Sequence, residues 1–248
     1  MTGKTALVTG GSRGIGRAIA LRLAECGARI AINYARNTPA AEETQRLIRE
    51  AGGEALMLRA NLGKRDKVEQ MFESLEKEWG GSLDILISNA ASGVIKPAVQ
   101  LSAHHWDFTM TINAGIFLPL VQHARKMMKD GGSIVAVSSI GALRAIPMYA
   151  AVGASKAALE SLVRHLAVEL AHEKIRINAV SAGVVDTDAL RHFPHRDDVV
   201  GNSMVKTPAG RLTEPSDVAD VILFLVSPLA QMVIGQTVTV DGGYGILA

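Results

Sequence analysis

Residues 5–16 read T-A-L-V-T-G-G-S-R-G-I-G, and a helix-like apolar pattern follows over residues 17–27. The apolar run predicts a buried strand, and the glycines predict a tight turn that leads directly into a helix. Gly10 permits the turn, Gly14 lets a phosphate approach the backbone, and Gly16 lets the helix pack on the strand. The N–H groups at the start of such a helix attract a pyrophosphate. The stretch therefore predicts a dinucleotide-binding turn, although strand-to-helix turns also use glycine for shape alone.

Strand-like and helix-like segments alternate along the rest of the chain. The strand-like segments are residues 5–9, 29–34, 54–59, 84–88, 131–137, 175–180 and 236–240. The helix-like segments are residues 17–27, 39–51, 64–79, 102–129, 149–172 and 215–226. This alternation predicts an α/β fold, with a doubly wound parallel sheet between helices on both faces and a ligand-binding edge at the strand ends.

The composition is that of a globular protein that binds neither nucleic acid nor membrane. With 48% hydrophobic and 20% charged residues, the chain can bury a sizeable core. A net charge of +2 and 4% aromatic residues argue against nucleic-acid binding, which uses basic faces and aromatic stacking. No apolar run reaches the roughly 18 residues of a membrane span, and the single cysteine, Cys26, cannot form an internal disulfide. We therefore expect a cytoplasmic location.

No linker rich in proline, serine or charge divides the 248 residues, so we expect a single domain over residues 1–248. Residues 186–211 show weak periodicity, which fits a substrate lid or a long surface loop. Ala189, Leu190 and Phe193 there fit the lining of an apolar channel or ordinary core packing, and Arg191, Arg196 and Arg211 fit contact with an acidic partner protein or solvated charge. The histidine pairs at 104–105 and at 192 and 195 lack further ligands, so we expect no metal site.

No acidic residue follows the second strand. A site that selects NAD usually places Asp or Glu there, to accept a hydrogen bond from the ribose 2′-hydroxyl. Residues 33–36 instead read N-Y-A-R. Arg36, together with Arg13 in the glycine turn, could clamp a 2′-phosphate, which favours NADPH. The alternative is that both arginines are solvated surface charges.

Residues 138–156 read S-S-I-G-A-L-R-A-I-P-M-Y-A-A-V-G-A-S-K, with Tyr149 seven positions before Lys156. On an α-helix, positions four and seven before a lysine lie within ~60° of each other, but the further one lies ~4.5 Å along the axis. In ketone reduction the proton and the hydride converge on one C=O group. In conjugate reduction two carbons separate the carbonyl oxygen from the hydride-accepting end of the double bond. The longer spacing favours conjugate reduction, the alternative being a core tyrosine and a solvated lysine.

Together these residues resemble the short-chain dehydrogenase/reductase family over almost the whole chain. Residues 9–16 look like its cofactor turn, residues 88–91 (S-N-A-A) like its N-N-A-G segment, and residues 240–243 (V-D-G-G) like its C-terminal signature. The resemblance implies a seven-stranded Rossmann-type sheet and, commonly, a homotetramer. The cofactor contacts that we expect are Gly10, Ser12, Arg13, Gly14, Ile15, Gly16, Arg36, Asn61, Leu62, Asn89, Lys156, Val185 and Thr187.

The chain departs from the ordinary Tyr-x-x-x-Lys motif of that family, because Val152 stands four positions before Lys156. Tyr149 instead makes Tyr-x6-Lys, the pattern of the enoyl-acyl-carrier-protein reductases. The stretches that look closest to the NADPH-dependent enoyl reductase III branch are residues 89–93, 140–156 and 186–194. Two smaller departures are Asn61, where the family usually has Asp near the adenine, and Ala182, where it usually has Pro.

The expected catalytic set is Tyr149, Lys156, Ser139 and Asn113. Tyr149 would donate a hydrogen bond to the developing enolate oxygen, and Lys156 would bind the nicotinamide ribose and stabilise the charge. Ser139 resembles the substrate-facing serine, although Ser138 could equally point inward. Asn113 resembles the asparagine that holds the helix geometry, although its own helix could satisfy it.

We therefore expect an NADPH-dependent reductase of trans-2-enoyl thioesters carried by acyl carrier protein or coenzyme A, in fatty-acid or polyketide assembly. One alternative is a short-chain ketoreductase or alcohol dehydrogenase. The other is a non-catalytic NADP(H)-binding regulator.

Overall fold

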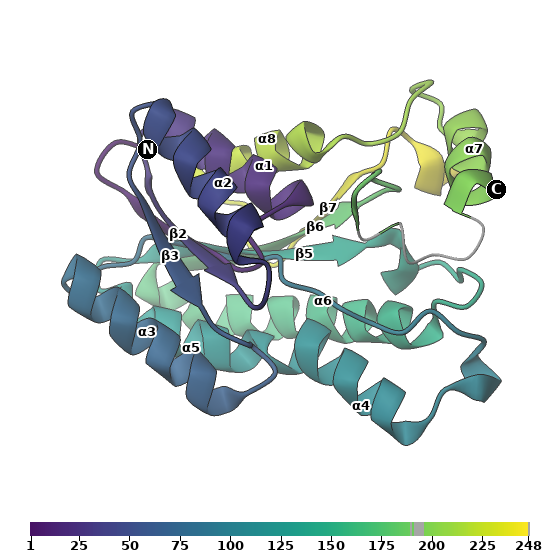
Figure 1. Ribbon diagram of the computed structural model, residues 1–248, viewed down its shortest axis with the longest axis horizontal. Helices are drawn as coiled ribbons and strands as arrows, with labels where there is room; N and C mark the ends of the chain where they lie inside the picture. Colours follow the sequence, from purple (N-terminus) through teal and green to yellow (C-terminus); the bar gives the residue numbers. More distant parts are fainter. Residues whose placement is uncertain (189, 191–195, 248) are drawn as a thin grey trace.

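The computed structural model describes residues 1–188, 190 and 196–247, which form a seven-stranded sheet with helices on both faces (Figure 1). The strands are β1 (Thr5–Val8), β2 (Arg29–Tyr34), β3 (Ala55–Arg59), β4 (Ile85–Ser88), β5 (Gly132–Ser139), β6 (Ile175–Ala182) and β7 (Thr237–Val240). Their order is β3-β2-β1-β4-β5-β6-β7, and every neighbouring pair is parallel. This confirms the predicted Rossmann-type doubly wound sheet, whose order reverses between β1 and β4, where such sheets bind ligands.

The helices divide between the two faces of the sheet. They are α1 (Gly14–Glu25), α2 (Thr38–Glu50), α3 (Arg65–Trp79), α4 (Ala103–Met110), α5 (Phe117–Met127), α6 (Ala150–Leu170), α7 (Arg196–Lys206) and α8 (Pro215–Val226). In Figure 1, α1, α2 and α8 lie above the sheet, and α3, α5 and α6 lie below it, with α4 packed against α6. None of the helices in the described part of the chain has both the length and the apolar character needed to cross a bilayer.

Side chains of the central strands alternate between two buried clusters. Leu7, Leu86 and Ile134 belong to the cluster between the sheet and helices α3, α5 and α6. Val8 and Ile87 belong to the cluster between the sheet and helices α1 and α8. Both faces of the sheet are buried, which explains why the strands read as continuous apolar runs. The observed register keeps the residues that follow β1, β4 and β5 together at one edge of the sheet.

The predicted helix over residues 102–129 is wrong in its middle, where a π-helical turn, Thr111–Gly115, separates α4 from α5. The N–H group of Ile116 donates to the carbonyl of Thr111 at 2.9 Å, five residues back instead of four. The side chain of Asn113 forms its hydrogen bonds outside this helix, which stabilises the wider turn. Apolar periodicity does not reveal such a turn, because the residues on both sides keep a helical pattern.

The weak periodicity of residues 186–211 conceals a helix, α7. Ser203 is its one buried residue among those described, so α7 has no continuous apolar face that a sequence pattern could reveal. The interpretation of the whole segment as a loop is therefore wrong for residues 196–206.

The contact at Gly16 generates a stability prediction. A Cβ on Gly16 would overlap the carbonyl oxygen of Gly10 and lie 2.6 Å from Nδ2 of Asn89. We expect Gly16→Ala to lower the free energy of unfolding by about 1–3 kcal/mol, the usual cost of overpacking. Urea denaturation measures this loss.

Gly201→Ala is the matched control, because no atom lies within 4 Å of the added carbon at this exposed position of α7. Alanine in a helix should make this variant more stable by about 0.5–1 kcal/mol. Equal stabilities of the two variants would contradict the packing described for Gly16.

Candidate active site

The neighbouring strand β4 holds the glycine turn in place. The side-chain amide of Asn89 donates to the carbonyls of Thr9 and Gly10 at 3.0 and 3.2 Å. The hydroxyl of Thr9 accepts from the N–H groups of Asn89 and Ala90. Gly10 and Gly14 have φ angles of +62° and +54°, which residues with side chains rarely adopt. The turn carbonyls are bonded back into the sheet, while the first N–H groups of α1, which have no partner within their helix, can bind an anion.

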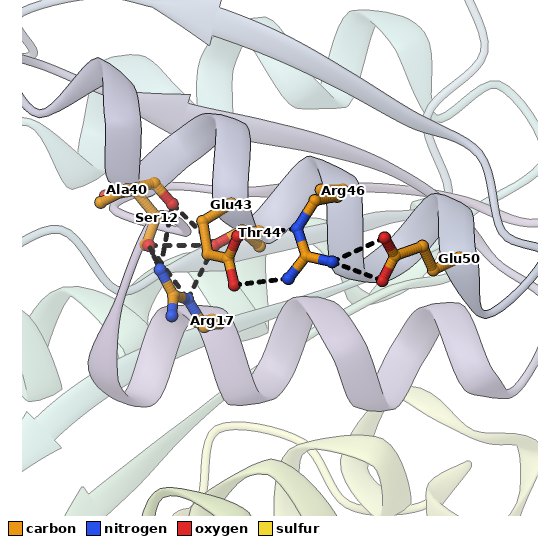
Figure 2. A network of polar contacts seen from close by, with 7 residues as sticks. All are labelled: Ser12, Arg17, Ala40, Glu43, Thr44, Arg46 and Glu50. Carbon is orange, nitrogen blue, oxygen red and sulfur yellow. Dashed lines mark hydrogen bonds and ion pairs between the residues drawn. The ribbon is translucent and has the colours of Figure 1, made fainter.

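Arg17 joins the same turn to α2, a role that no motif in the sequence predicts. Its guanidinium donates to the carbonyl of Ser12 at 2.9 Å, to the hydroxyl of Thr44 at 2.9 Å and to the carbonyl of Ala40 at 3.1 Å (Figure 2). Ser12 is buried, and Ile15 packs against the apolar core. The clue in the sequence is a cation in the first turn of a helix, where the helix dipole disfavours it unless it has specific partners.

Residues 33–36 contain a buried amide and an exposed guanidinium. Asn33 is buried, and its side chain donates to two carbonyls at the end of β3. Arg36 and Arg13 are exposed, and Arg13 forms an ion pair with Asp188 at 3.4 Å. No carboxylate occurs among residues 33–36, so a ribose 2′-hydroxyl would find no acidic acceptor there.

The other predicted cofactor positions differ in their surroundings. Thr187 lies against the glycine turn, since its Cγ2 would be 3.3 Å from a Cβ on Gly14. Val185 is buried, and Leu62 is part of the core, so only the backbone of Leu62 is available to a ligand. Asn61 is exposed, and its side-chain oxygen accepts at 3.1 Å from the N–H group two residues further on.

Tyr149 lies at the start of α6, beside the end of β5. Its hydroxyl donates to Oγ of Ser139 at 3.5 Å, and its ring is so close to Gly141 that a Cβ there would lie 2.5 Å from Cε1. The other serine, Ser138, donates instead to the carboxylate of Glu160 at 2.5 Å. Burial raises the pKa of the Tyr149 phenol, and the hydrogen bond with Ser139 lowers it less. The phenol is therefore protonated at neutral pH and can donate.

The residue before Tyr149 has an uncommon backbone conformation. Met148 has a φ of +61°, in the left-handed region, and its carbonyl accepts from the N–H group of Lys96 at 3.0 Å. This conformation costs about 1–2 kcal/mol for a residue with a side chain. The helix begins at Ala150, one residue later than predicted, and Tyr149 is its N-cap. Met148 therefore sets the direction from which the phenol approaches Ser139.

Lys156 contributes a buried ammonium on the same helix. Its Nζ donates to the carbonyl of Val137 on β5 at 2.7 Å. Burial lowers the pKa of this ammonium to about 8, and the charge of Glu160 acts in the opposite direction. At pH 7 the group is mainly protonated, so a buried positive charge lies near the end of β5, where Tyr149 meets its serine.

Asn113 connects the π-helical turn to two other elements. Its Oδ1 accepts from the N–H group of Ser92, after β4, at 2.9 Å, and its Nδ2 donates to Oγ of Ser155, on α6, at 2.9 Å. The hydroxyl of Ser155 donates to the carbonyl of Val152 at 2.6 Å. Asn113 is buried, and its side chain holds α6 against the loop after β4, not its own helix.

Val152 occupies the position of the ordinary tyrosine and serves as a packing residue. It is buried, and a Cβ on Gly93 would overlap its Cγ2. The loop after β4 thus approaches α6 closely at this point. The phenol that meets the serine comes from three positions earlier in the chain.

Several other suggestive side chains have structural partners. Nδ1 of His105 accepts from the N–H group of Ser102 and caps α4. Arg196 and Arg211 form ion pairs with acidic residues at 2.7 and 2.6 Å, and Leu190 is buried. No cluster of metal-binding side chains occurs in the described part of the chain. The predictions for Ala189, Arg191, His192, Phe193 and His195 lie outside the described residues.

The backbone of Met148 generates a second prediction. Met148→Val should lose about 1–3 kcal/mol of stability, because a β-branched residue resists the left-handed conformation. Met148→Gly should stay within about 1 kcal/mol of the parent, since relief of strain offsets the added flexibility of the unfolded chain. Thermal unfolding of the two variants measures the difference, and a valine variant as stable as the glycine variant would contradict the proposed constraint.

Comparison with known proteins agrees with this geometry. A family model described as enoyl-(acyl carrier protein) reductase matches residues 10–245. The chain is 39% identical to 1-cyclohexenylcarbonyl-CoA reductase of Streptomyces collinus, over 99% of this chain and 88% of that protein. It is 34% identical to a hydroxynaphthalene reductase-like protein of Metarhizium robertsii, over 98% and 95%.

Solved structures of similar proteins superpose closely. A reductase that catalyses keto-reduction in lugdunomycin biosynthesis has a TM-score of 0.92 and 36% identity, covering 99% of both chains. A 7α-hydroxysteroid dehydrogenase in complex with NADH has a TM-score of 0.93 and 32% identity, over 98% of this chain and 94% of the other. A Serratia marcescens short-chain dehydrogenase/reductase has a TM-score of 0.92 and 31% identity, over 98% of both. The protein described here therefore belongs to the short-chain dehydrogenase/reductase family, whose members are oxidoreductases that use a nicotinamide cofactor.

Proposed function

We propose that this protein reduces the C2=C3 double bond of trans-2-enoyl thioesters, with NADPH as the hydride donor. The observation that carries the proposal is the contact of Tyr149 with Ser139, combined with a buried valine at the position of the ordinary tyrosine. The phenol therefore lies seven positions before Lys156 instead of the ordinary four. The longer spacing suits a substrate whose carbonyl oxygen, which accepts from the phenol, is two carbons away from the carbon that accepts hydride. The family model supports the proposal. So does the relative named for 1-cyclohexenylcarbonyl-CoA, a thioester whose double bond is conjugated to its carbonyl.

In the proposed conjugate reduction, each side chain of the site has a different role. Bound NADPH would supply hydride to Cβ. As the electrons of the double bond move toward the thioester oxygen, Tyr149 donates a hydrogen bond to that oxygen, and Ser139 is close enough to share this role. The charge of Lys156 would stabilise the enolate, and its ammonium would bind the ribose hydroxyls of the cofactor. The enolate then takes a proton at Cα, from Tyr149 or from water, to give the saturated thioester.

The choice of NADPH rests on residues at the glycine turn and after β2. The turn fits a pyrophosphate, because its carbonyls are bonded elsewhere and α1 begins beside it. A 2′-phosphate would meet the exposed guanidinium groups of Arg13 and Arg36 and no carboxylate among residues 33–36.

Carbonyl reduction is the second candidate, and the names of two relatives favour it. One is hydroxynaphthalene reductase-like, and another catalyses keto-reduction. In that reaction Tyr149 would give its proton to the oxygen on the same carbon that receives hydride. The two candidates use the same residues and differ in the distance between hydride and proton at the substrate.

The wider setting of the reaction is part of the proposal. We propose acyl carrier protein or coenzyme A as the carrier and fatty-acid or polyketide assembly as the pathway. We also propose a homotetramer in the cytoplasm. Exposed apolar side chains, which are suited to contacts between subunits, support an oligomer; they include Val168, Phe224, Leu229 and Met232.

The reaction is tested with purified protein, NADPH and either crotonyl or acetoacetyl thioester. We expect NADPH oxidation with the crotonyl substrate, and Tyr149→Phe should lower kcat by about 10²–10³-fold, as loss of an oxyanion donor does. NADPH binding, followed by nucleotide fluorescence, should change little in this variant, because the phenol serves the substrate. Oxidation with the acetoacetyl substrate alone would establish the second candidate instead.

Cofactor selection is tested by removing one guanidinium at a time. Arg36→Ala and Arg13→Ala should each weaken NADPH binding about tenfold, the value of a charge-assisted hydrogen bond to phosphate, and leave NADH binding unchanged. Arg46→Ala is the matched control, since Arg46 lies on α2 and pairs with Glu43 and Glu50 (Figure 2). Equal losses of affinity for NADPH and NADH would show that these arginines do not bind the 2′-phosphate.

A further inference from the structure

Glu160 is a buried carboxyl group that the proposed reaction does not use. It is 4% exposed and lies on α6, one helical turn after Lys156. Its Oε1 accepts from the hydroxyl of Ser138, on β5, at 2.5 Å. A buried carboxylate is costly unless a nearby charge or strong donors compensate it, so its surroundings are informative.

Two effects act on the ammonium of Lys156. From β5 it meets the carbonyl of Val137, and its burial lowers its pKa. The charge of Glu160 raises that pKa. Glu160 therefore acts in the direction that keeps Lys156 protonated.

Position and orientation fit a role as counter-charge. Residues four apart on a helix lie on the same face, so Glu160 and Lys156 both face the end of β5. The carboxylate is held by the strand through Ser138, and the ammonium is held by the same strand through Val137. Consecutive residues of β5 therefore fix both members of the pair, one through a side chain and one through a carbonyl.

We propose that Glu160 is a positioning residue that supplies the buried negative charge keeping Lys156 protonated at neutral pH, and that Ser138 holds its carboxylate in place. Burial alone would favour a neutral amine, which would stabilise an enolate less well and bind an anionic cofactor less tightly. The inference deepens the proposed function, because the charge of Lys156 matters for the reaction proposed above.

The test is a titration of the full-length protein without cofactor or substrate. Lysine ¹³Cε resonances are followed by NMR from pH 6 to pH 11, and the Lys156 resonance is identified by its absence in Lys156→Met. The midpoint for Lys156 should be about 8 in the parent protein. In Glu160→Gln, which can keep the hydrogen bond to Ser138 without the charge, it should fall by roughly one pH unit.

Two further variants separate charge from structure. Glu160→Asp keeps the charge and should move the midpoint less than Glu160→Gln does. Glu169→Gln removes an exposed carboxylate from the same helix and should not move it. If Glu160→Gln does not fold, as judged by circular dichroism, Glu160→Met replaces it with an apolar side chain of similar length.

A Lys156 midpoint that is unchanged in the uncharged Glu160 variant would overturn the proposal and leave Glu160 as a link between helix and strand. Because the titration needs neither NADPH nor an enoyl substrate, this outcome is distinct from failure of the proposed reaction. As a second readout, NADPH affinity in Glu160→Gln should begin to fall at a lower pH than in the parent protein.

Discussion

The hydrogen bond from Nζ of Lys156 to the carbonyl of Val137 joins the helix that carries the site to the strand that ends beneath it. Moving an ammonium out of water costs free energy of hydration, so a buried ammonium needs hydrogen-bond acceptors or negative charge nearby. The carbonyl of Val137 accepts from the ammonium, and the charge of Glu160 offsets part of the effect of burial, which still lowers the pKa of Lys156 to about 8. The contact between Tyr149 and Ser139 depends on the same arrangement, because it needs α6 to stay in one place against β5.

The position of the phenol follows from two constraints on α6. Val152 packs on Gly93, and Asn113 bonds to Ser155, so the loop after β4 and the π-helical turn hold the helix from one side. At the start of the helix, the left-handed backbone of Met148 turns the chain so that the next side chain faces β5. Backbone strain at such a point is typical of sites where one side chain must be directed accurately. The position of the phenol thus results from packing and local strain around it.

The cofactor half of the site relies on rigidity of a different kind. Asn89, directly after β4, donates from its side chain to the backbone of the glycine turn, and the hydroxyl of Thr9 accepts from the N–H group of Asn89. Arg17, on α1, joins the turn to α2. The turn carbonyls are engaged inside the protein, whereas the N–H groups at the start of α1 have no partner within their helix. An anion can therefore bind without rearrangement of the backbone, and loss of conformational entropy on binding is small. The same packing explains why a side chain at Gly16 would disturb the turn.

The sequence by itself determined the alternation of strands and helices, the doubly wound sheet, the glycine turn and the identity of the family. The alternation, the sheet and the turn depend on periodicity and on glycine positions, which are local properties of the chain, whereas the family is indicated by the resemblance of its motifs. Sequence spacing also predicted Tyr149 and Lys156 on one helix, with Val152 at the ordinary tyrosine position; in the structure Tyr149 is the N-cap of that helix, which begins at Ala150. It did not reveal the π-helical turn, because that turn depends on the bonds of Asn113 to residues far away in the chain.

Only the tertiary structure decided which of the two serines meets the phenol. Ser138 turns to Glu160 and Ser139 to Tyr149, because successive residues of a strand point to opposite sides. The structure likewise revealed Arg17 and Glu160, whose partners lie on other elements and leave no local pattern. The physical reason is the same in each case. The role of a side chain depends on the groups that folding brings into contact with it. The order of residues in the sequence does not give the distances between groups that are far apart in the chain.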